Sequence, residues 1–143
     1  MVFSKSFGYA VRSILYIVMT SEEQPRVQIL EIADHLKIPR HFLGKIMKQL
    51  AKERIIDSVK GPFGGFSINN KTTTTPLIKI LQLTDGMGQF KECVLKLKTC
   101  NAAKPCAMHE RIEKNRKELM AIFTGTTVGD LIKTDVKNFV DYI

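Results

Sequence analysis

Three cysteines and a histidine lie close together in the second half of this 143-residue sequence, and they are the residues best suited to chemistry. Six residues separate Cys93 from Cys100, five separate Cys100 from Cys106, and two separate Cys106 from His109. Thiolate and imidazole groups are typical ligands of zinc and iron. Nearby positive charge favours the thiolate form, and four lysines flank the cysteines: Lys91, Lys96, Lys98 and Lys104. The pattern therefore indicates a metal or redox site.

The spacing of these residues leaves three kinds of site open. An odd number of cysteines argues against a disulfide framework. Structural zinc sites usually pair cysteines two to four residues apart, and this sequence has no such pair. An iron–sulfur cluster tolerates thiolates spread over a long loop and accepts histidine in place of cysteine. The spacing thus favours a cluster first, unliganded thiols second and zinc third. If Cys106 begins a helix, His109 lies one turn later on the same face.

Basic residues are concentrated in one stretch of the first half. Residues 37–60 hold seven lysines and arginines against two acidic residues, within a chain of net charge +8. Such a stretch favours a polyanionic partner. The hydrophobic fraction of 44% excludes a disordered chain. The apolar run 14–19 is much shorter than the roughly 20 residues that cross a bilayer. We therefore expect a soluble, unprocessed cytoplasmic protein with no membrane partner.

Hydrophobic periodicity predicts three helices in the first half, over residues 4–20, 29–36 and 40–53. Pro39 suits the first turn of the third helix, where its missing amide proton costs nothing. The predicted buried stripe of that helix consists of Leu43, Ile46, Met47 and Leu50. The opposite face then presents mainly basic residues around one glycine: His41, Gly44, Lys45, Lys48 and Lys52.

A glycine-rich turn follows the basic helix. Two short β-rich runs, 55–60 and 66–68, flank Gly-Pro-Phe-Gly-Gly at 61–65, which predicts a β-hairpin. The turn lacks the Lys-Ser/Thr ending and the following helix of a phosphate-binding loop. Short helices followed by a hairpin predict a winged helix-turn-helix. The residues expected to contact DNA are Arg40, His41, Gly44, Lys45, Lys48 and Lys52 of the helix, and Lys60, Gly61, Gly64 and Gly65 of the wing.

The second half predicts a helix over 77–85, an aperiodic stretch over 86–105, a long helix from Cys106, and a short element at 127–131. The long helix has a heptad-like seam of Met108, Ile112, Asn115, Leu119 and Ile122. A single asparagine in such a seam can fix the register of two associated helices. We therefore favour self-association through this helix over the alternative, a core helix with one polar residue at its rim. The fold class is therefore mainly α with a small β-hairpin wing. Residues 1–75 form the DNA-binding domain, and 76–143 hold the cysteine loop and the dimerisation helix.

The run Ser-Val-Lys-Gly-Pro-Phe-Gly-Gly-Phe at 58–66 resembles a family signature, Ser-Val-Arg-Gly-Pro-x-Gly-Gly-Tyr. It is the wing signature of the Rrf2 family of winged-helix regulators, typified by IscR and NsrR. Supporting matches, spread over nearly the whole chain, are Tyr9-Ala10, Glu31-Ile32-Ala33, Ile38, the cysteine and histidine set, and 127–131. The resemblance implies a homodimer on a pseudo-palindromic double-stranded DNA operator. It also implies that helix 40–53 enters the major groove, that the wing lies near the minor groove, and that the long helix crosses its partner's.

The resemblance also implies a ligand set. Cys93, Cys100 and Cys106 match the family's cluster thiolates, and His109 matches the histidine that completes a 2Fe-2S site in the IscR branch. Three cysteines serve either a 2Fe-2S or a 4Fe-4S cluster. The chain departs from the family pattern in three respects. The first cysteine gap is six residues rather than five, Gly8 replaces an acidic ligand found in some members, and the wing has Lys60 and Phe66 instead of arginine and tyrosine.

The sequence therefore predicts a transcriptional regulator, with a repressor favoured, whose operator affinity depends on an iron–sulfur cluster or on the redox or nitrosative state of the cysteine loop. One alternative is the same regulator with zinc or bare thiols. Another is a protein-interaction module that does not bind DNA. An enzyme is not expected, because the sequence shows no paired-carboxylate, Ser/His/Asp or nucleotide-binding pattern.

Overall fold

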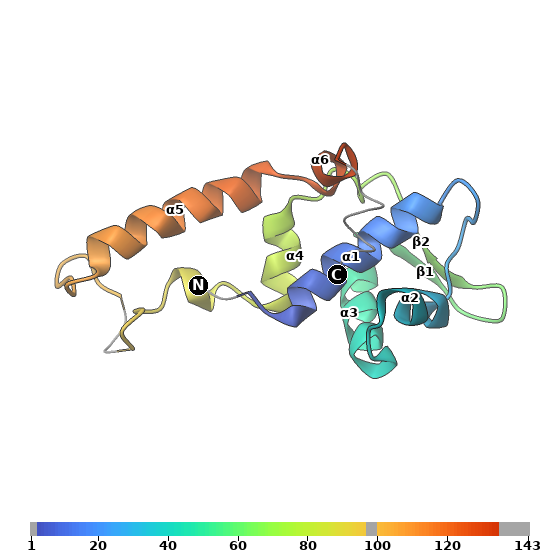
Figure 1. Cartoon of the computed structure of the whole chain (residues 1–143), viewed down its shortest axis with the longest axis horizontal. Helices are drawn as coiled ribbons and strands as arrows, with labels where there is room; N and C mark the ends of the chain where they lie inside the picture. The colour runs from blue at the N-terminus through green and yellow to red at the C-terminus, as the bar shows by residue number, and fades with distance from the viewer. Residues whose placement is uncertain (1–2, 97–99, 135–143) are drawn as a thin grey trace.

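The computed structural model describes residues 3–96 and 100–134 and is mainly helical, with one small β-hairpin at its edge (Figure 1). The wing lies at one end of the long axis, and the turn before α5 lies at the other (Figure 1). The elements are α1 (Lys5–Thr20), α2 (Ile29–Leu36), α3 (Arg40–Lys52), β1 (Asp57–Val59), β2 (Gly65–Ser67), α4 (Leu77–Thr84), the 3₁₀ turn Gly88–Phe90, α5 (His109–Gly125) and α6 (Val128–Ile132).

The ends of the first three helices follow from local chemistry. The Ser4 hydroxyl accepts a hydrogen bond from the Phe7 amide at 3.2 Å and caps α1. Lys37 ends α2 in the left-handed region, with φ of 56°. Pro39 is the residue before α3 rather than a member of its first turn, which corrects the prediction for this residue. The Leu43 amide bonds to the Pro39 carbonyl at 3.0 Å, so the helical hydrogen bonds begin there.

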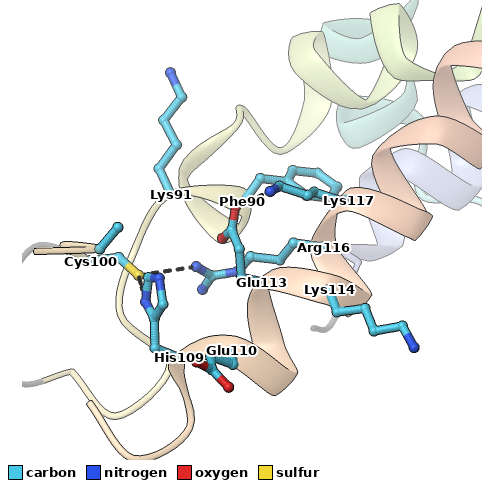
Figure 2. A pocket seen from close by; sticks show the side chains of 10 residues that line it. Phe90, Lys91, Cys100, His109, Glu110, Glu113, Lys114, Arg116 and Lys117 are labelled. Atoms are coloured by element: carbon cyan, nitrogen blue, oxygen red, sulfur yellow. Dashed lines mark hydrogen bonds and ion pairs between the residues drawn. The ribbon is translucent and has the colours of Figure 1, made fainter. Parts of the chain in front are cut away.

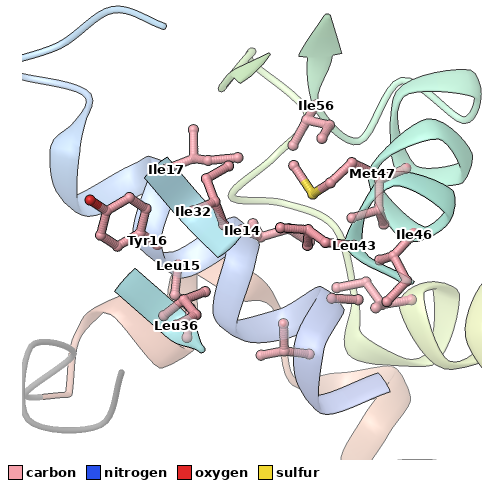
Figure 3. Packing of buried hydrophobic residues seen from close by; sticks show 14 of the residues in the cluster. Ile14, Leu15, Tyr16, Ile17, Ile32, Leu36, Leu43, Ile46, Met47 and Ile56 are labelled. Carbon is pink, nitrogen blue, oxygen red and sulfur yellow. The ribbon is translucent and has the colours of Figure 1, made fainter. Parts of the chain in front are cut away.

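The core lies between α1, α2 and α3, and α4 covers one side of it (Figure 3). The central face of α1 contributes Ile14, Leu15 and Ile17, all almost fully buried. The predicted inner stripe of α3 is confirmed, because each of its members is buried: Leu43, Ile46, Met47 and Leu50. With this stripe inside, the basic positions of α3 must face outward.

The wing is a short antiparallel ladder in which Asp57 pairs with Ser67 and Val59 with Gly65. Its strands are shorter than predicted, because Ile55 and Ile56 are buried before β1 begins. A backbone bridge joins Val27 and Phe66 through two hydrogen bonds of 2.9 Å. This bridge fixes the hairpin to the segment that enters α2, so wing and helices form one unit.

Helix α5 extends away from the winged part, as Figure 1 shows. It begins at His109 and not at Cys106, so the predicted long helix is shorter at its start. Cys106 lies in the preceding turn, where its carbonyl accepts a hydrogen bond from the His109 amide at 3.0 Å. The expectation that Cys106 and His109 share one helix face is therefore wrong. Within the described ranges, no helix is long and apolar enough to cross a membrane.

Candidate nucleic-acid interface and cysteine site

The outward face of α3 carries the basic residues that the sequence pattern placed there. His41, Lys45, Lys48 and Lys52 are exposed, as is Arg40 at the start of the helix. In the part of the chain that the structure describes, none of these lysines, nor Arg40, forms an ion pair with a carboxylate. Their charges are therefore available to an anionic ligand such as a phosphate backbone.

Two further residues complete this face. Gly44 is half-buried, and a β-carbon there would lie 3.7 Å from the Ile29 side chain of α2, so the residue marks the approach of α2 to α3. Phe42 is 49% exposed, and its ring lies 4.5 Å from the His41 ring, centroid to centroid. The sequence pattern does not mark Phe42 as a surface residue, because a phenylalanine next to a predicted apolar stripe is expected to be buried.

The wing turn has a defined backbone. Lys60 and Gly61 are exposed, whereas Gly64 is buried. A β-carbon on Gly64 would lie 2.0 Å from the Val59 carbonyl oxygen, so only glycine fits. Gly65 has a φ of +135°, and a β-carbon there would meet the Val27 carbonyl oxygen at 2.7 Å. The fold of the wing therefore requires glycine at both positions, independently of any DNA contact.

A side chain that sequence analysis missed, Gln28, anchors the wing turn. Its Nε2 donates hydrogen bonds to the carbonyl oxygens of Gly64, at 2.7 Å, and of Pro62, at 3.4 Å. Gln28 immediately precedes α2, so it connects the tip of the wing to the helix-turn-helix. No periodic pattern distinguishes such a glutamine, because its partners lie 34 and 36 residues away along the chain.

The cysteine site lies at the start of α5, where Cys100 meets His109 (Figure 2). The Cys100 Sγ lies 3.2 Å from the His109 Nδ1. Arg116, about two turns later in α5, directs its Nη1 toward the same sulfur at 3.7 Å. A cavity of about 750 Å³ opens beside these groups, with a largely charged lining that includes Lys91, Glu110, Glu113, Lys114 and Lys117.

Arg116 holds the cysteine loop against the helix. It is the buried residue of α5, with 6% of its surface exposed. Its Nη2 donates a hydrogen bond to the carbonyl oxygen of Glu92, immediately before Cys93. Its Nε is buried and has no hydrogen-bond partner within the described residues. One guanidinium group therefore contacts both ends of the segment between Cys93 and Cys100.

The predicted ligand set is brought together only in part. Cys100 and His109 are in contact, Cys93 is buried, and Cys106 is half-buried in the turn before α5. Among the described residues, no group of three or more cysteine, histidine or acidic side chains is placed to hold a metal ion. Of the lysines that flank the loop, Lys96 pairs with Glu92 at 2.9 Å, and Lys98 lies outside the described residues.

Two carboxyl groups, one beside the cysteine loop and one at the start of α6, have shifted pKa values. The hydrogen bond from Lys96 and its charge lower the pKa of Glu92. The Thr127 backbone and hydroxyl groups lower the pKa of Asp130, because they donate hydrogen bonds to its carboxylate at 2.9 and 3.0 Å. In return, the Asp130 amide donates to the Thr127 hydroxyl, which completes a capping box at the start of α6.

The predicted dimerisation seam is largely uncovered. Ile122 is 57% exposed, and Met108 and Asn115 are also exposed. Ile112 and Leu119 are half-buried. The part of the chain that the structure describes thus leaves an apolar strip along α5 that a second surface could cover.

Comparison with known proteins gives a consistent result. The Rrf2 family model, described as an iron-dependent transcriptional regulator, matches residues 3–134. The chain is 34% identical over 140 residues to an HTH-type transcriptional regulator of Aquifex aeolicus, covering 96% of each chain. It is 23% identical to the regulator IscR of Klebsiella pneumoniae, covering 87% of this chain and 75% of the relative.

Solved structures share the fold. The cysteine regulator CymR of B. subtilis superposes with a TM-score of 0.75 at 17% identity, covering 93% of this chain and 97% of that one. IscR of T. potens superposes with a TM-score of 0.67 at 20% identity, covering 93% and 87%. The winged-helix fold predicted from the sequence is therefore confirmed.

Proposed function

Because the chain belongs to the Rrf2 family of transcriptional regulators, we propose that it is a repressor that binds a pseudo-palindromic operator as a homodimer, and that an iron–sulfur cluster in the cysteine loop sets its affinity. The observation that carries the DNA-binding part is the basic face of α3, whose lysines form no ion pair with any described residue, together with a wing fixed by Gln28. As a family member, the chain is a regulator and not an enzyme.

The basic face has the distribution that a DNA-binding helix needs. Lys45, Lys48 and Lys52 contact phosphates and set the position of the protein, while Arg40 and His41, at the start of α3, reach base edges in the major groove. Lys60 contacts a phosphate beside the wing. Phosphate contacts release counterions, so affinity should fall steeply with salt.

The homodimer part of the proposal is supported by the strip along α5. In a two-fold dimer each helix would cover the exposed side chains of the other, and Asn115 would lie against its own counterpart or near it. The two α3 helices would then enter successive major grooves about one helical turn of DNA apart, roughly 34 Å. A pseudo-palindromic operator follows from that symmetry.

The chemistry of the donor set supports the cluster. Cys93, Cys100, Cys106 and His109 would hold it, and Cys100 and His109 are already in contact. When bound, the cluster would supply an iron centre that responds to oxidants or to nitric oxide. Arg116 keeps the loop close to α5 through the Glu92 carbonyl, so a change in the loop reaches the helix that carries the dimer strip.

One observation favours a second candidate, a regulator that senses through bare thiols. Cys100 has an imidazole at 3.2 Å and a guanidinium at 3.7 Å, a setting in which a thiol can be oxidised reversibly. The winged-helix part of the function is the same in both candidates. They differ in whether the purified protein contains iron.

Two measurements test the proposal. Duplexes selected from a random pool should share a pseudo-palindrome, and their affinity should fall with salt and be weakened by Lys45→Ala. Protein purified without oxygen should contain iron and acid-labile sulfide in equal amounts. It should also absorb visible light, and Cys106→Ala should remove this absorbance. If the protein is iron-free and colourless, the result would support sensing through bare thiols or zinc instead of a cluster. Failure to select any duplex would refute DNA binding.

A further inference from the structure

The tip of the wing presents a large apolar side chain to solvent. Phe63 has 89% of its surface exposed, the highest value among the exposed large hydrophobic residues of the described chain. Single exposed apolar residues are common on protein surfaces, so exposure alone indicates no function. The significance of Phe63 comes from the backbone that holds it.

That backbone is fixed on both sides of Phe63. The preceding carbonyl, of Pro62, and the following one, of Gly64, accept hydrogen bonds from the same Gln28 amide group. The Gly64 amide donates to the Gly61 carbonyl at 3.0 Å and closes the turn. Pro62 has a restricted φ, and Gly64 is packed too tightly for any side chain. The phenyl ring therefore projects from a turn whose conformational entropy is already low.

The surroundings of the ring suit a polyanion. Lys60 is exposed three residues before it, and no acidic residue occurs from 58 to 81. The wing is also joined to α2, which packs on the basic α3. Because the wing is attached in this way, its rigid apolar group would be carried to the duplex when the basic face of α3 binds.

We propose that Phe63 is a wedge that enters the minor groove beside each half-site, inserts between two base pairs and kinks the DNA. This inference rests on the DNA binding proposed above. Phenylalanine is one of the side chains that proteins insert between base steps in this way. The ring has no hydrogen-bonding group, so it would select the sequence through the ease of unstacking. Pyrimidine–purine steps such as TA and CA unstack most easily, and Phe63 would favour them.

The test uses the full chain and a duplex selected by it. The bend is measured by energy transfer between dyes at the duplex ends, and the unstacked step is located by 2-aminopurine fluorescence. Wild-type protein should bend the DNA and raise the fluorescence at one step per half-site. Phe63→Ala should lose both signals and bind about tenfold more weakly, the size expected for removing one aromatic contact with a base. Phe63→Leu, which keeps an apolar wedge, should retain most of the bend.

The outcomes separate this inference from the function on which it rests. Because Phe63 is exposed, all three proteins should unfold at the same temperature, so a loss of binding reports a lost contact. Equal affinity, bend and fluorescence for wild type and Phe63→Ala would overturn the wedge and leave DNA binding intact. A wild-type protein that binds no duplex would overturn the proposed function itself. If Phe63→Ala impairs binding to another protein but not to DNA, the wedge is also overturned.

Discussion

Replacing Arg116 with leucine should destabilise the cysteine loop. The arginine is buried, donates a charged hydrogen bond to the Glu92 carbonyl and contacts the Cys100 sulfur. A hydrogen bond to a charged group contributes about 1.5–3 kcal/mol, and the sulfur contact adds less. Leucine recovers part of this by removing a buried charge whose Nε has no partner in the described chain. We therefore expect a net loss of about 1–2 kcal/mol in the free energy of unfolding.

The assay is urea unfolding of metal-free protein at one fixed protomer concentration, because self-association would shift the midpoint. Amide hydrogen exchange should show faster exchange at residues 92–96, where the loop is held, and little change in α1. Arg111→Leu is the matched control, since Arg111 lies on the same helix, is exposed and should change stability by less than about 0.5 kcal/mol. If Arg116→Leu behaves like Arg111→Leu, the buried guanidinium does not hold the loop.

The remaining predictions concern a lysine of the basic face, a glycine of the wing and the capping box of α6. Lys48→Ala should weaken binding to all duplexes alike and reduce the salt slope of log Kd by about one, measured by anisotropy titrations; a change in sequence preference would contradict a phosphate contact. Gly65→Ala should lower the free energy of unfolding by more than about 2 kcal/mol, because Gly65 has a φ of +135° and a β-carbon there would lie 2.7 Å from the Val27 carbonyl oxygen. Thermal unfolding measures the effect, and a variant as stable as wild type would contradict this backbone strain. The lowered pKa of Asp130 stabilises the fold above the ordinary value of 3.8, and this contribution is lost as the pH falls through the lowered pKa. Asp130→Asn should remove that part of the pH dependence in unfolding curves, and identical curves for both proteins would exclude it.

Much of the winged domain could be predicted from the sequence because periodicity reports burial directly. The stripe of α3 alternates with charged residues at helical spacing, and Gly64 and Gly65 of the wing turn are required by close backbone approaches. Strand ends were harder to predict: Ile55 and Ile56 have strong β-propensity but point into the core before the ladder begins. Propensity does not distinguish a buried extended segment from a paired strand.

The cysteine site was less predictable because it depends on contacts between distant segments. Arg116 lies on the predicted dimerisation helix but outside its seam, and only contact with the cysteine loop shows that it is buried. The sequence pattern predicts that Cys106 begins the long helix, yet α5 starts at His109, and no side-chain cap marks that start. The family resemblance supplied the ligand set, which spacing alone left open. The role of Gln28 could not be predicted either, since both its hydrogen-bond partners are backbone carbonyls of a distant turn.

The anchoring of the wing turn by Gln28 also bears on how such a protein can change over evolutionary time. Gly64 and Gly65 cannot be altered without strain, whereas position 63 between the anchored carbonyls contacts almost nothing. A single codon change there alters the group presented to a ligand while the folded scaffold keeps its stability. Most substitutions that alter binding also lower stability and need compensation elsewhere. At this position the two properties are separated, so new ligand preferences can arise in one mutational step.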